Sequence, residues 1–150
     1  MPKLHNTSIL GILLAAVAFW IVGALWYGFI FADDWMMLNG ITQAQAEAQM
    51  AENGIMTYVY GFLIALAQVI GLNWLINWAG ASRWRKCVEV ALITVTFIAL
   101  PVMLYEWNYE GESIRASILD LGHLAVGYGV VGLVLSAFRG KDAIEVDALS

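Results

Sequence analysis

Two long stretches of this 150-residue chain carry no charged side chain, and this feature limits the fold more than any other. Residues 8–31 and 55–81 contain no Asp, Glu, Lys or Arg. An α-helix needs about 20 apolar residues to cross a hydrocarbon layer about 30 Å thick, and both stretches exceed that length. Two shorter uncharged runs, 90–105 and 121–138, follow them. The pattern predicts four membrane-spanning helices.

Composition and hydrophobic pattern both favour a membrane protein over a soluble helical bundle. Hydrophobic residues make up 61% of the chain and charged residues 13%, whereas soluble domains contain about 45–50% and 25%. Helices of a soluble bundle would have polar outer faces, and the first two runs are apolar on all sides. We therefore expect a single all-α domain over residues 1–150, an integral membrane four-helix bundle. Its spans are expected near residues 8–32, 55–80, 88–106 and 115–138, followed by a cytoplasmic tail at 139–150.

The basic residues predict the orientation of the chain in the membrane. In the four-span arrangement only one basic residue, Arg115, falls on the outer side. The other basic residues share the opposite side: Lys3, Arg83, Arg85, Lys86, Arg139 and Lys141. Because Lys and Arg in short loops stay in the cytoplasm, both termini are expected there. We expect a multi-pass protein of the bacterial inner membrane, in contact with membrane lipids and with no nucleic-acid partner.

The connection between the first two spans predicts a short helix on the outer surface. Thr42 and Gln45 have the spacing of a capping box, and residues 43–52 are rich in helix formers. Asn53-Gly54 then provides a signal for the end of the helix. Two roles remain open for this helix: a lid over an outward cavity, or a spacer between two spans.

Small residues at helical spacing predict where helices approach one another closely. The candidates lie on the first and fourth spans: Gly11, Ala15, Gly127, Gly129 and Gly132. The sequence does not say whether the helix that packs against them belongs to the same chain or to another copy. Because so small a bundle has little room for an internal cavity, we expect a homo-oligomer or association with other membrane subunits.

Ionisable residues inside the spans are the strongest pointers to function, since each costs about 2.5–3.5 kcal/mol at the centre of a helix. Asp120 and His123 are three residues apart and share one face of the fourth span. Glu106 lies at a similar depth near the end of the third span, where Pro101 is expected to kink the helix. We expect Glu106, Asp120 and His123 to converge in the outer leaflet, with Arg115 near the mouth of the site.

Three interpretations of this cluster remain open. In the first, an Asp–His hydrogen bond and a carboxylate paired with Arg115 hold the third and fourth spans together. In the second, the cluster binds a ligand or a proton, for which a histidine pKa near 6.5 is suitable. In the third it is enzymatic, but Ser117, Asp120 and His123 lie side by side on one helix, which is not the geometry of a triad. We predict no catalytic residue, metal site or cofactor; the other histidine, His5, lies at the opposite face.

Several motifs resemble those of an uncharacterised bacterial membrane family, domain of unknown function 1761. The resemblance in the first half rests on Gly23-Ala24-Leu25-Trp26-Tyr27-Gly28, Phe31, Trp35 and Gly40-Ile41-Thr42. In the second half it rests on Tyr109-Glu110-Gly111, Asp120, Gly122, His123 and Gly132. It implies a small four-helix integral membrane protein, with no activity, cofactor or catalytic residue attached. The family pattern often has Asn at the position of Asp120, so a charge there is not assumed to be essential.

The sequence as a whole favours a non-enzymatic binding or assembly component of the membrane. A small transporter or proton-conducting protein that uses Glu106, Asp120 and His123 is the alternative, and a membrane-embedded enzyme is the third. Gln68, near the middle of the second span, needs a hydrogen-bond partner or water. The basic turn 83–86, with three charges, is a candidate contact for anionic lipid headgroups.

Overall fold

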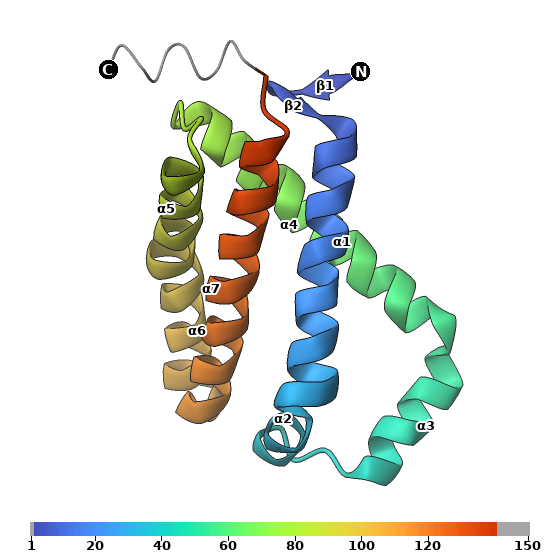
Figure 1. Cartoon of the computed structure of the whole chain (residues 1–150). Coiled ribbons are helices and arrows are strands. Elements are labelled where there is room, and N and C mark those ends of the chain that lie inside the picture. Colours follow the sequence, from blue (N-terminus) through green and yellow to red (C-terminus); the bar gives the residue numbers. More distant parts are fainter. Residues whose placement is uncertain (1, 141–150) are drawn as a thin grey trace.

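The computed structural model describes residues 2–140, and four long apolar helical segments organise them (Figure 1). These candidate membrane spans are Ile9–Ile30, Ile55–Trp78, Trp84–Glu110 and Ile114–Ala137. Each is long and apolar enough to cross a bilayer. The prediction of an all-α, four-helix membrane fold is confirmed, and the chain is a multi-pass membrane protein. Of the expected cytoplasmic tail, residues 141–150 lie outside the described part of the chain.

Two of the spans are single α-helices, and the other two contain wider π-helical turns. The single helices are α4 (Ile55–Trp78) and α7 (Ile114–Ala137). The first span consists of α1 (Ile9–Leu25) and a π-helical turn, Trp26–Ile30. The third span consists of α5 (Trp84–Thr94), a π-helical turn (Val95–Ala99), α6 (Leu100–Tyr105) and a second π-helical turn (Glu106–Glu110). Pro101, which has no N–H to donate, is the second residue after the first of these turns, and a regular α-helical hydrogen bond is impossible there.

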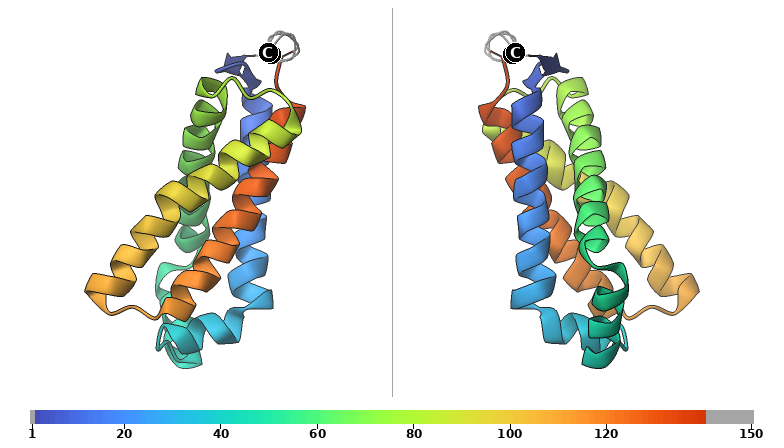
Figure 2. Two further views of the ribbon diagram at one scale, coloured as in Figure 1. Left: turned by 90° about the vertical axis from the view of Figure 1, so that its left-hand side faces the viewer. Right: turned by 90° about the vertical axis from the view of Figure 1, so that its right-hand side faces the viewer.

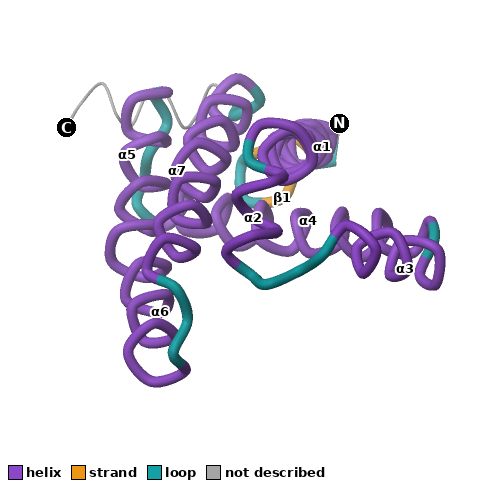
Figure 3. Tube along the Cα trace, turned by 90° about the horizontal axis from the view of Figure 1, so that it is seen from below, coloured by secondary structure: helices purple, strands orange, loops and turns teal. Residues whose placement is uncertain are grey.

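Two short helices connect the first and second spans. α3 (Gln43–Asn53) is the predicted surface helix, and its capping box is confirmed: the Thr42 Oγ1 accepts from the Gln45 N–H, and the Gln45 Oε1 accepts from the Thr42 N–H. It packs against the start of α4, buries none of its residues and lies to one side of the other spans (Figures 1 and 3). This position favours the spacer role. The sequence did not predict α2 (Ala32–Leu38), which packs against α7.

The four spans pack in the order α4, α1, α7, α5, with α7 in contact with both α1 and α5 (Figures 1 and 3). α4 and α5 meet near the turn that joins them, while α4 and α6 diverge toward the other end of the bundle (Figure 2). The buried apolar residues are concentrated toward the first end: Ile12, Ala15, Ala16, Phe19, Ala65, Val69, Leu72, Ile76, Ala81, Cys87, Ala91, Val131 and Leu135. The half of the bundle farther from this end is called the distal half below.

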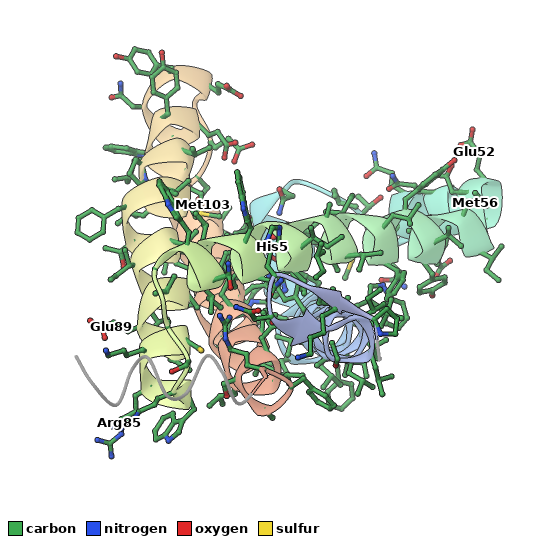
Figure 4. The ribbon with its side chains drawn as sticks, turned by 90° about the horizontal axis from the view of Figure 1, so that it is seen from above. His5, Glu52, Met56, Arg85, Glu89 and Met103 are labelled. Atoms are coloured by element: carbon green, nitrogen blue, oxygen red, sulfur yellow. The ribbon has the colours of Figure 1, made fainter. Side chains whose placement is uncertain are left out.

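A small hairpin closes the end of the bundle near the core. Its strands, β1 (Lys3–Leu4) and β2 (Thr7–Ser8), pair antiparallel around His5 and Asn6, which both have positive φ as in a type I′ turn. Thr7 also bridges to Arg139, just beyond α7, and its Oγ1 donates to the Asn73 Oδ1 at 2.7 Å. Seen along the bundle, His5 lies over α4 (Figure 4). The hairpin therefore ties the adjacent ends of α1, α4 and α7 together.

Four of the five predicted small-residue positions pack within the chain: Gly11, Ala15, Gly127 and Gly132. Gly132 of α7 packs against the backbone of α5. A Cβ added to Gly132 would lie 3.0 Å from the carbonyl oxygen of Cys87. Gly129 is different, because a Cβ there would meet no heavy atom within 4 Å. The segments that pack closely against these four small residues thus belong to the same chain. A homo-oligomer stays a prediction, and it needs a surface other than these four positions.

Candidate functional site

Two grooves in the distal half of the bundle share Tyr27, Gln68 and His123 in their walls. The first, called the Asp120 groove, has a volume of about 530 Å³ and is also lined by Trp35, Met103, Asp120 and Leu124. The second, called the Trp20 groove, has a volume of about 360 Å³ and lies mainly between α1 and α4. Its other lining residues include Phe19, Trp20, Gly23, Thr57, Tyr58 and Gly61. The three shared residues come from three different spans, so the grooves lie where these spans diverge.

Asp120 is held by the first span. The hydroxyl of Tyr27 donates a hydrogen bond to the Asp120 Oδ1 at 2.7 Å. Tyr27 is the second residue of the π-helical turn that extends α1, and such wide turns recur at functional sites. A hydrogen bond to a carboxylate is shorter and stronger than one between neutral groups. The bond joins the first and fourth spans, whereas the structural interpretation of the cluster expected a link between the third and fourth.

His123 lies one helical turn along α7 from Asp120 and is surrounded by aromatic rings. Its imidazole stacks on Phe19, with ring centroids 5.3 Å apart and planes 14° apart, and its centroid is 4.9 Å from that of Tyr27. The Nε2 atom is buried and has no hydrogen-bond partner among residues 2–140. It faces Gly23, where a Cβ would be only 3.2 Å away, so the glycine leaves space for the ring. An unpartnered buried nitrogen costs about 1–3 kcal/mol, and its presence at a groove wall indicates a place for a ligand atom.

The side chain of Gln68, near the middle of the second span, has a hydrogen-bond partner. The hydroxyl of Tyr128 donates to the Gln68 Oε1 at 2.9 Å, which joins the second and fourth spans. The Gln68 amide nitrogen makes no hydrogen bond to any residue in the range 2–140, so its two N–H groups are available at the grooves. Sequence reasoning singled out Gln68, but it named neither Tyr27 nor Tyr128 as a site residue. Nothing in the sequence distinguishes these two tyrosines from tyrosines that only anchor a span at the membrane–water interface.

The other two predicted site residues, Glu106 and Arg115, line neither of the two grooves. Glu106 begins the last π-helical turn, is half-buried and lines neither groove, whereas Met103, one turn earlier, lines the Asp120 groove. Arg115 is exposed and lines a separate hollow of about 390 Å³ with Asp34. Neither Glu106 nor Arg115 forms a hydrogen bond or ion pair with another residue that the structure describes.

The described residues offer few further chemical groups near the grooves. Within residues 2–140, no three His, Cys, Asp or Glu side chains are grouped closely enough to hold a metal ion. The hydroxyl of Ser117 donates back to the carbonyl of Ser113 at 3.4 Å, and Ser117 lines neither groove. The arrangement is therefore two aromatic-walled grooves that share an imidazole, an amide and a tyrosine, with a carboxylate in one of the two grooves.

Comparison with known proteins gives one match. Residues 10–136 match a family described as "Protein of unknown function (DUF1761)". The match begins at the second residue of α1 and ends one residue before the end of α7, so it includes nearly all of the four spans. No curated protein and no solved structure matches the chain.

Proposed function

We propose that this chain, which belongs to the DUF1761 family of proteins of unknown function, is a non-enzymatic binding component of the membrane that holds a small, flat amphipathic molecule. The observation that carries the proposal is the buried, unpartnered Nε2 of His123 where two aromatic-walled grooves meet. Ligand pockets are mostly apolar, with a few polar groups that fix the orientation of the ligand. The two grooves have this composition.

The lining residues indicate the chemistry of the ligand. Trp20, Tyr27 and Trp35 offer ring faces and edges to a flat molecule. The imidazole of His123 and the free amide N–H groups of Gln68 are donors for a carbonyl or hydroxyl oxygen. A ring that carries one or two such oxygens and an apolar tail satisfies the polar groups while the tail stays in lipid. A short-chain benzoquinone has these properties and serves as a probe.

The proposed orientation follows from charges that the fold gathers at opposite ends. The hairpin, the α4–α5 turn and the end of α7 lie at one end of the bundle (Figure 1). This end carries Lys3, Arg83, Arg85, Lys86 and Arg139, whereas Asp33, Asp34, Glu47 and Glu52 lie in α2 and α3 at the other end. Because basic residues stay in the cytoplasm, the hairpin end is cytoplasmic in this proposal, and the protein belongs in a bacterial inner membrane. The two grooves then belong to the outer half of the bilayer.

Quenching of tryptophan fluorescence by the benzoquinone tests the proposal in purified, detergent-solubilised protein. We expect saturable quenching in the wild type and a dissociation constant at least about tenfold higher in His123→Asn, which is about 1.4 kcal/mol. His5→Asn is the matched control, since His5 lies at the other end and Asn tolerates its positive φ. Quenching that does not saturate in the wild type, or that is the same in His123→Asn, would reject the quinone-like ligand.

A proton-conducting role is the second candidate, and the contact between three protonatable groups favours it. Asp120 accepts from Tyr27 at 2.7 Å, and the Tyr27 ring centroid is 4.9 Å from that of His123. Liposomes that contain a pH-sensitive dye measure the flux for wild type, Asp120→Asn and His123→Ala. This role predicts a wild-type flux above that of empty liposomes and a loss in both variants. A wild-type flux equal to that of empty liposomes removes it.

A further inference from the structure

A hollow of about 600 Å³ lies at the turn that joins α4 to α5, far from the two grooves. Six residues line it: Ser82, Arg83, Trp84, Arg85, Lys86 and Ser136. Three of these are basic and two carry hydroxyl groups. Ser136 belongs to the end of α7, so the hollow lies between the start of α5 and the last turn of α7. This composition indicates an anion as the occupant.

The backbone adds positive potential to the same place. α5 is 11 residues long and begins at Trp84, and no side chain caps its N-terminus. The first N–H groups of a helix point outward and carry partial positive charge, which favours phosphate and other anions. Ser82 gives an independent indication of a ligand. It is only 3% exposed and lines the hollow, and its Oγ has no hydrogen-bond partner in the part of the chain that the structure describes.

The exposed side chains place this end of α5 at the level of lipid headgroups. The guanidinium of Arg85 lies 5.3 Å from the centre of the Trp84 ring, and both residues are exposed. Tryptophan is enriched at membrane–water interfaces, where its ring contacts lipid and its N–H remains hydrated. Arg85 extends away from the bundle, and Glu89 is the acidic residue one turn further along the helix (Figure 4). Glu89 does not line the hollow.

An apolar groove begins one helical turn below the hollow. It has a volume of about 350 Å³, lies between α4 and α5, and is lined by Leu75, Trp78, Val90, Ile93, Phe97 and Ile98 among others. Lys86 lines the hollow and Val90 lines the groove, and residues four apart share one face of a helix. A molecule with a phosphate at the α5 N-terminus therefore finds space for a hydrocarbon chain along the same helix.

We propose that the α4–α5 turn binds an anionic phospholipid, with its phosphate at the start of α5 and an acyl chain in the apolar groove. Ser82, Arg85 and Lys86 donate hydrogen bonds to the phosphate oxygens, and the α5 N-terminus adds its partial charge. Anionic lipids are attracted to basic segments on the cytoplasmic side, where the charge pattern of this chain places the turn. The site is independent of the His123 grooves, so either proposal stands or fails without the other.

Native mass spectrometry of the detergent-solubilised full chain tests the site. The probes are phosphatidylglycerol and phosphatidylcholine with the same acyl chains, and glycerol phosphate as a soluble competitor. We expect the wild type to retain phosphatidylglycerol at least about fivefold more than phosphatidylcholine. Arg85→Gln with Lys86→Gln should abolish that preference. The matched control, Lys3→Gln with Arg115→Gln, removes the same charge from outside the hollow and should keep the preference.

Ser82→Ala gives a second measurement if the charge variants fail to fold. It removes only a hydroxyl that has no partner among the described residues, so the thermal midpoint should stay that of the wild type while phosphatidylglycerol retention falls severalfold. Equal retention of the two lipids by the wild type overturns the proposal, as does full retention in Ser82→Ala. A control pair that loses the preference overturns it too. Displacement of the lipid by equimolar glycerol phosphate would show a site for free phosphate, which also contradicts a lipid site.

Discussion

Gly132 is the position where one added methyl group should separate two spans. A Cβ there would lie 3.0 Å from the Cys87 carbonyl oxygen and 3.1 Å from the Val88 Cα, whereas ordinary contacts begin at 3.4 Å. The obstructing atoms belong to the α5 backbone, so no side chain can rotate away. Gly132→Ala therefore forces α5 and α7 apart by about 0.3–0.4 Å at their contact, and such overpacking costs about 1–3 kcal/mol.

Gly129→Ala is the matched control, because it makes the same chemical change one turn away with no heavy atom within 4 Å of the new Cβ. Both variants gain the same helix propensity, at most about 1 kcal/mol. The difference between their free energies of unfolding therefore isolates the packing cost, about 1–3 kcal/mol. Unfolding in mixed micelles with increasing sodium dodecyl sulfate, followed by tryptophan fluorescence, measures both variants. Equal unfolding midpoints, or a Gly132→Ala variant more stable than Gly129→Ala, would show that the two backbones are not in contact.

Three further predictions concern the polar contacts and the buried cysteine. A double-mutant cycle of Tyr27→Phe and Asp120→Asn should give a coupling free energy of about 0.6–1.7 kcal/mol; unfolding free energies that simply add would argue against the hydrogen bond. Thr7→Val should destabilise the protein by about 1–3 kcal/mol in the same unfolding assay, because the buried Asn73 Oδ1 loses its donor; a wild-type midpoint would contradict this. Cys87, which is 0% exposed, should react with a maleimide in dodecyl sulfate and only slowly in mild detergent; rapid labelling of the folded protein is the opposing result.

The sequence by itself determined the spans and the capping box, because both depend only on the contact of a residue with lipid or with its close neighbours in the chain. A charge that faces lipid is costly in any span, and a spanning helix satisfies its backbone hydrogen bonds within itself. The uncharged runs therefore define the four spans before any packing is known. The capping box at Thr42 and Gln45 is equally local, since both of its hydrogen bonds join residues three apart.

Tertiary structure alone decided which side chains meet. Asp120 bonds to a tyrosine 93 residues away, and neither residue carries a signal for the other. The physical reason is that lipid tails are as apolar as a protein core, so hydrophobic periodicity does not show which face of a span is turned inward. Trp20 and Trp74 both lie in uncharged spans, yet Trp20 lines a groove while Trp74 is 61% exposed. That Glu106 lines neither groove likewise follows from how the third span is placed beside α7, which no sequence pattern records.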